Sequence, residues 1–183
     1  MHAVLVFLLE TVAFLLVGSA LLRAWMNQLR INMSGQPGRF VMAMTHWLVG
    51  PVRRLLPRPL AQSRVDWGSL VAAVLLALVY GLLWVLLQAM LMPGTVSPAL
   101  AAGVPVLAFK LLLRVLLQGL MVLLLVYAVL SWVQPASPVM ALLDRLCAPV
   151  LQPIRRVMPA IGGVDLSALV LILLLQVGLI LLG

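Results

Sequence analysis

Four long apolar runs constrain this chain more than any other feature of its sequence. They cover about residues 3–24, 69–92, 111–133 and 166–182. About 20 helical residues span the hydrocarbon core of a bilayer, and backbone groups cannot stay unpaired in lipid. Only 9% of the residues are charged, whereas a soluble domain carries about a quarter. The sequence therefore predicts an all-α integral membrane protein with four transmembrane helices, the fourth near the lower length limit.

The charged residues between the runs predict the orientation in the membrane. The loop from Arg23 to Asp66 and the loop from Gln134 to Asp165 are rich in arginine, whereas the loop from Pro93 to Phe109 carries no charge. The positive-inside rule places the two arginine-rich loops in the cytoplasm and both termini outside. The net charge of +8 indicates contact with anionic lipid headgroups rather than nucleic acid, because the arginines lie between apolar runs.

An internal repeat divides the sequence. Each half contains a tryptophan, then Pro-x-Arg-Arg-x-x-Pro, then Val-Asp, and then an apolar run. We therefore predict two parallel helix-loop-helix repeats at residues 1–92 and 111–183. A Pro- and Gly-rich linker at 93–110, in which prolines such as Pro105 should prevent helix formation, would join them. Apolar residues at helical spacing in 138–152, with a counterpart at 37–50, predict amphipathic helices lying in the membrane interface.

The Pro-x-Arg-Arg-x-x-Pro motif admits three interpretations. It can act as a topology signal with a rigid turn, as a lipid or partner site, or as a site for an anion or substrate. Its residues are Pro51, Arg53, Arg54 and Pro57 in the first half, and Pro153, Arg155, Arg156 and Pro159 in the second.

An aspartate precedes an apolar run in each half. Asp66 and Asp165 are positioned to cap the N-termini of these helices, and Ser167 adds a short polar group in the first turn. Both aspartates could also form salt bridges to an Arg-Arg pair, within a repeat or across the repeats. The two roles are compatible.

Several polar residues lie within the apolar runs or at their ends. Lys110, Arg114 and Gln118 follow a spacing of four and share one helix face, where Arg114 can reach the outer boundary. Glu10 lies deeper, and an isolated carboxylate there would be costly. We expect a Glu10–Arg114 pair; the alternative is a protonatable or cation-binding Glu10.

The sequence contains no signature of an enzyme. We find no nucleophile motif, phosphate-binding loop or metal signature, and we expect no cofactor. The only cysteine, Cys147, is interpreted as a small apolar residue, and His46 as an interfacial histidine.

The doubled motif, with "SW" closing the third run and "GGVDLS" opening the fourth, resembles the YggT family of bacterial membrane proteins. The resemblance covers nearly all of residues 5–182, although "RPLAQSRVDWGS" replaces the short glycine-rich turn in the first half. It implies a bacterial inner-membrane protein linked to cation or osmotic stress tolerance, cell division or membrane-complex assembly, and it implies no established catalytic activity. We expect a structural or lipid-organising factor whose partners are anionic lipids, a membrane protein or further copies of itself. The alternative is a cation channel or transporter that uses Glu10.

Overall fold

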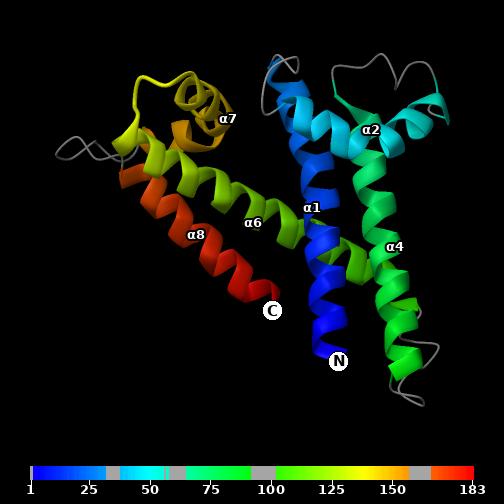
Figure 1. Cartoon of the computed structure of the whole chain (residues 1–183). Coiled ribbons are helices and arrows are strands. Elements are labelled where there is room, and N and C mark those ends of the chain that lie inside the picture. The colour runs from blue at the N-terminus through cyan, green and yellow to red at the C-terminus, as the bar shows by residue number, and fades with distance from the viewer. Residues whose placement is uncertain (1, 32–37, 56, 58–64, 92–101, 157–165) are drawn as a thin grey trace. The chain divides into compact units, whose positions relative to one another are not determined.

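A computed structural model describes residues 2–31, 38–55, 57, 65–91, 102–156 and 166–183. The described elements are all helices, and none of the described residues forms a strand (Figure 1). Three helices, α1, α4 and α6, are long and apolar enough to cross a membrane, and α8 is a shorter apolar helix. The helices are α1 (His2–Gln28), α2 (Gly38–Leu55), α4 (Trp67–Leu91), α6 (Val104–Val133), α7 (Pro138–Arg155) and α8 (Leu166–Leu182).

One predicted boundary is wrong. Helix α6 begins at Val104, so the second part of the predicted linker is helical. Pro105 lies in the first turn of α6, where a proline is favourable because its missing N–H would have had no helical partner. The carbonyl of Gly103 accepts a hydrogen bond from the N–H of Leu107 at 3.0 Å and so joins the first turn.

The chain forms two compact units, residues 1–115 and 116–183, which divide within α6. The first unit contains α1, α2, α4 and the beginning of α6. Small side chains dominate its core, which allows the helices to approach closely without large residues between them. The buried members of this core are Ala13, Val17, Ala20, Ala73, Ala77, Ala108, Leu111 and Val115.

A turn at the end of α1 redirects the chain. Arg30 has a φ of 53°, and the N–H of Ile31 donates to the carbonyl of Met26 at 3.0 Å. This is a Schellman motif, in which the left-handed position usually holds glycine. Met26 and Ile31, the two positions that usually form an apolar contact in this motif, are both buried.

Helix α2 lies across the adjoining ends of α1 and α4 and contacts both (Figure 1). Its buried residues, Val41, Thr45, Val49 and Val52, recur every three or four positions and therefore form one stripe. Val49 and Val52 pack with Ala72 of α4 in a separate small core. The predicted helix over 37–50 is thus present and extends to Leu55.

The second unit contains the rest of α6, with α7 and α8. The hydroxyl of Ser137 caps α7 by accepting from the N–H of Met140 at 3.1 Å. The buried residues of α7 are Leu143, Leu146, Cys147 and Leu151, and its exposed residues include Asp144, Arg145 and Gln152. Helix α7 contacts α8. The predicted helix over 138–152 is therefore also present.

Candidate functional site

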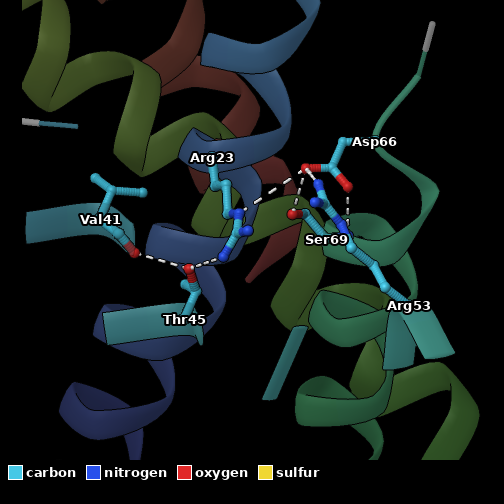
Figure 2. Close-up of polar contacts among 6 residues, drawn as sticks. All are labelled: Arg23, Val41, Thr45, Arg53, Asp66 and Ser69. Atoms are coloured by element: carbon cyan, nitrogen blue, oxygen red, sulfur yellow. Dashed lines mark hydrogen bonds and ion pairs between the residues drawn. The ribbon is translucent and has the colours of Figure 1, made fainter. Parts of the chain in front are cut away.

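Asp66 organises the junction of α2 and α4. It precedes the first residue of α4, and its Oδ1 accepts from the N–H of Ser69 at 3.2 Å. Its Oδ2 accepts from the hydroxyl of Ser69 at 2.8 Å. These are the contacts of a helix N-cap, which satisfy a backbone donor that lacks a helical partner. Figure 2 shows the carboxylate pointing to two arginines as well as to Ser69.

Those two arginines come from different helices. Arg53, in the last turn of α2, places Nη2 2.8 Å from Oδ2 of Asp66. Arg23 of α1 places Nε 3.9 Å from the same oxygen, and its Nη1 donates to Oγ1 of Thr45 at 2.9 Å. The Thr45 hydroxyl in turn donates to the carbonyl of Val41 at 2.7 Å. We call Arg23, Thr45, Arg53, Asp66 and Ser69 the Asp66 cluster, and it connects α1, α2 and α4 (Figure 2).

The exposures of the two arginines differ within the Asp66 cluster. The side chains of Arg23 and Asp66 are 6% and 2% exposed, whereas that of Arg53 is 46% exposed. Two positive charges and one negative charge leave an excess positive charge. The exposed part of that charge lies with Arg53, at the end of α2.

Gly68 makes room for Arg53. A Cβ at this position would lie 2.5 Å from Cγ and 3.1 Å from Nε of Arg53. The arginine stem therefore rests directly on the backbone of the first turn of α4. Any larger residue at position 68 would push this stem away from Asp66.

The surroundings of Asp66 favour its ionised form. Burial alone would raise the pKa of this carboxyl group. The hydrogen bonds from Arg53 and Ser69, together with the charge of Arg53, outweigh burial and hold the pKa below its usual value. Asp66 is therefore a carboxylate at neutral pH.

The beginning of each Pro-x-Arg-Arg-x-x-Pro motif is helical, and the rigid turn stays a prediction. Pro51 and Pro153 lie inside α2 and α7. Arg53, Arg54 and Arg155 lie in the last turns of these helices, and Arg156 is the C-cap of α7. A proline inside a helix removes one hydrogen bond, but its fixed φ suits the helix, and the buried neighbouring residues offset the loss. Pro57 is exposed beyond α2, whereas Pro159 and Asp165 lie outside the described residues.

The matching arginine of the second unit has other contacts. Nη2 of Arg155 donates to the hydroxyl of Tyr127 at 2.6 Å, and its Cζ lies 5.9 Å from the centre of that ring. Nη1 of Arg155 lies 3.9 Å from Oδ1 of Asp144. Arg156 caps α7 through its backbone N–H, and Ser167 is buried in the first turn of α8.

Glu10 contacts a residue that we did not predict. Its carboxyl group and the hydroxyl of Tyr80 on α4 form a hydrogen bond, and the charges of Glu10 and Arg114 both act on Tyr80. The three residues therefore lie close together on α1, α4 and α6. Glu10 and Gln118 are half-buried and Arg114 is exposed. Tyr80 therefore joins the two residues that we expected to meet, and a direct Glu10–Arg114 pair stays a prediction.

Sequence reasoning missed Arg23 and Thr45 as members of the site. We interpreted Arg23 only as a topology signal, although it follows Ala20 by three positions and continues the buried stripe of α1. That spacing was the available signal. Thr45 lies among Val41, Val49 and Val52 on the buried stripe of α2, and the helical period of that segment could have revealed it.

The long apolar helices, with two amphipathic helices that end in paired arginines, define a helical protein of the membrane class. The chain belongs to the CCB3/YggT family, whose model matches residues 2–87 and 106–183. The two matched segments fit the two repeats in the sequence.

Several bacterial proteins are similar to this chain over most of its length. The "Uncharacterized protein YggT" of Escherichia coli K12 is 37% identical over 94% of this chain and 86% of its own. A Vibrio alginolyticus protein named "Uncharacterized protein in proC 3'region" is 33% identical over 97% of this chain and 92% of its own. An uncharacterized Pseudomonas aeruginosa protein is 28% identical over 93% of this chain and 84% of its own. No solved structure matches the chain.

Proposed function

We propose that this chain is a non-catalytic structural factor of the bacterial inner membrane, which organises lipids or assembles membrane complexes at the cytoplasmic surface. The observation that carries this proposal is the Asp66 cluster. It ties the amphipathic helix α2 to the ends of two apolar helices through ion pairs and hydrogen bonds. Such a connection presents a surface of fixed geometry.

The energetics of the Asp66 cluster favour a positioning role over a purely stabilising one. A buried ion pair often adds little net stability, because desolvation offsets the attraction of the charges. Removal of one partner is nevertheless strongly destabilising, since it leaves a buried charge without compensation. The cluster therefore specifies one arrangement of α2 and penalises others.

The cation-transport alternative rests on a separate observation. Glu10, Tyr80 and Arg114 bring polar groups from three helices together inside the apolar part of the first unit. Polar residues within membrane helices often line ion pathways. The hydrogen bond between Glu10 and Tyr80 supports a packing role, because a paired carboxylate is less available to a passing ion.

Ion flux through the purified chain in liposomes discriminates between the two proposals. We expect no cation flux above that of empty liposomes, for the natural chain and for Glu10→Gln and Arg155→Ala. Flux that Glu10→Gln abolishes and Arg155→Ala leaves intact would establish transport and overturn the structural role. The Arg155→Ala variant controls for nonspecific leakage, since Arg155 lies in the other unit.

The proposed role includes membrane integrity under osmotic or cation stress, or during cell division. A deletion strain complemented with the chain should recover growth at high salt or regain normal cell length. Complementation by Glu10→Gln but not by Asp66→Ala, at equal protein levels, would support the structural role. The reverse pattern would contradict it.

A further inference from the structure

The exposed side of α2 carries both large apolar and basic side chains. Phe40, Trp47 and Leu55 are 62%, 59% and 85% exposed. Arg39 and Arg54 are also exposed, and α2 contains no acidic residue. Phe40 and Trp47 are seven residues apart and therefore share a side of the helix, with Arg39 and His46 on the adjacent stripe.

The indole N–H of Trp47 already has a hydrogen-bond acceptor within its own helix. Its Nε1 donates to the carbonyl of Met44 at 2.8 Å. A tryptophan in water or among headgroups can leave this N–H to the solvent, but an N–H moved into hydrocarbon needs a partner. The internal hydrogen bond therefore lowers the free-energy cost of placing this exposed ring in an apolar environment.

The two arginines of the first motif have different roles. Arg53 is engaged by Asp66 at 2.8 Å, so its guanidinium group is held within the Asp66 cluster. Arg54 is exposed beside it, and Arg39 is exposed near the other end of α2. Arg39 lies on the stripe beside Phe40 and Trp47, whereas Arg54 lies at the end of α2, seven residues after Trp47 and on the same side. Both long side chains can extend towards lipid phosphates while Phe40 and Trp47 enter the acyl chains.

We propose, building on the structural role above, that α2 is a built-in docking helix for the anionic phospholipid leaflet of the same membrane. Phe40 and Trp47 enter the acyl-chain region, and Arg39 and Arg54 bind lipid phosphates. The Asp66 cluster holds α2 in this position. The charge of the arginine pair, without an acidic residue on α2, makes an anionic lipid the complementary occupant.

Helix α7 provides an internal comparison. It contains no aromatic residue, and its exposed side carries Asp144, Arg145 and Gln152. When Pro51 is aligned with Pro153, Leu142 and Pro149 take the places of Phe40 and Trp47. Lipid docking through aromatic side chains is therefore a property of the first half.

Tryptophan quenching of the full chain in lipid nanodiscs tests this proposal. Lipids brominated in the acyl chain quench nearby indoles, and subtraction of the Trp47→Phe signal isolates Trp47 from the other four tryptophans. We expect bromolipid to quench Trp47, and brominated phosphatidylglycerol to do so more strongly than brominated phosphatidylcholine. Arg39→Gln with Arg54→Gln should reduce this preference by at most about fivefold per arginine.

The matched control is Arg145→Gln with Arg156→Gln on α7, which should leave the preference unchanged. Quenching of Trp47 by aqueous iodide but not by bromolipid would overturn the proposal. Protection of Trp47 from both quenchers would also overturn it, in favour of a protein partner or a second copy. Equal quenching by the two brominated lipids would refute the anionic preference. None of these outcomes depends on ion flux, so the structural role is tested separately.

Discussion

Gly68 determines how closely Arg53 can approach Asp66, because the arginine stem occupies the space where a Cβ would lie. The substitution Gly68→Ala should displace this stem and weaken the ion pair. Overpacking of this kind costs about 1–3 kcal/mol. Thermal unfolding in detergent would measure the effect.

Gly119 provides the control for this prediction. It lies in α6 and is followed by leucine, and a Cβ there would meet no atom within 4 Å. Gly119→Ala should therefore be neutral, or stabilising by up to about 1 kcal/mol through helix propensity. A Gly68→Ala variant as stable as Gly119→Ala would refute the importance of close approach.

The ionised state of Asp66 predicts a specific dependence of stability on pH. The pKa of Asp66 in the folded chain lies below its ordinary value of 3.8. The ionised carboxylate therefore contributes stability at pH values above this ordinary pKa, and the contribution is lost as pH falls through the folded pKa. The free energy of unfolding should fall below about pH 4 in the natural chain.

The Asp66→Asn variant separates this effect from the other carboxyl groups. It should be less stable than the natural chain at pH 7, and its stability should change less between pH 5 and acid pH. Denaturant unfolding over this range would provide both curves. Parallel curves for the two proteins would show that Asp66 does not carry the acid sensitivity.

At the scale of single elements, the attachment of α2 depends on groups that α2 does not itself contain. Arg23 belongs to α1 and Asp66 precedes α4, and both contact α2 through Thr45 or Arg53. Substitution of Arg23 by methionine removes the bond to Thr45 and keeps an unbranched apolar stem. Amide hydrogen exchange in residues 38–55 should then become about tenfold faster, as expected for a loss of about 1.4 kcal/mol.

This experiment has two controls. The first is amide hydrogen exchange in α7 of the same variant, and the second is exchange in α2 of a variant at Arg30. Arg30 is exposed at the end of α1, so Arg30→Gln should leave α2 unchanged. Unaltered exchange of α2 in Arg23→Met would mean that apolar packing alone holds this helix.

The helices that could be predicted were those for which the sequence pattern lies within one continuous segment. The apolar runs indicated α1, α4 and α8 closely, and the helical period indicated α2 and α7. Asp66 before an apolar run indicated a helix cap, which depends on local spacing. The start of α6 was missed because Pro105 reads as a helix breaker until its position in the first turn is known.

The contacts between elements were harder to predict. Arg23, Thr45 and Tyr80 acquire their roles from residues far away in the sequence, and the pairing of Glu10 with Tyr80 depends on the rotation of two helices. The sequence shows that a polar residue lies in an apolar run, but it does not show which residue of another helix that polar residue contacts. The Asp66–Arg53 contact was one of several pairings that the sequence allowed.

For the whole molecule, the two units use a similar plan with different residues. When Pro51 is aligned with Pro153, the buried Val41, Thr45 and Val49 of α2 correspond to the buried Leu143, Cys147 and Leu151 of α7. The first arginine of each motif contacts a helix outside its own, through Asp66 in one unit and Tyr127 in the other. This correspondence supports the repeat interpretation.

The number of membrane crossings can be measured through the position of the C-terminus. With four crossings, alkaline phosphatase fused after Gly183 should be active outside the membrane, whereas a fusion after Pro57 should be inactive. Green fluorescent protein at the same two sites should give the opposite pattern. An inactive phosphatase after Gly183 would mean that α8 does not cross, and that the chain has three spans.

Cys147 is fully buried in α7, and burial, with the nearby charge of Asp144, raises the pKa of its thiol to about 11. At neutral pH only about one molecule in ten thousand would carry the reactive thiolate. We therefore expect the natural chain to react with maleimide reagents as slowly as a cysteine-free protein. Spin labels or fluorophores can be introduced at new surface cysteines without replacing Cys147, which leaves the interior of the second unit intact.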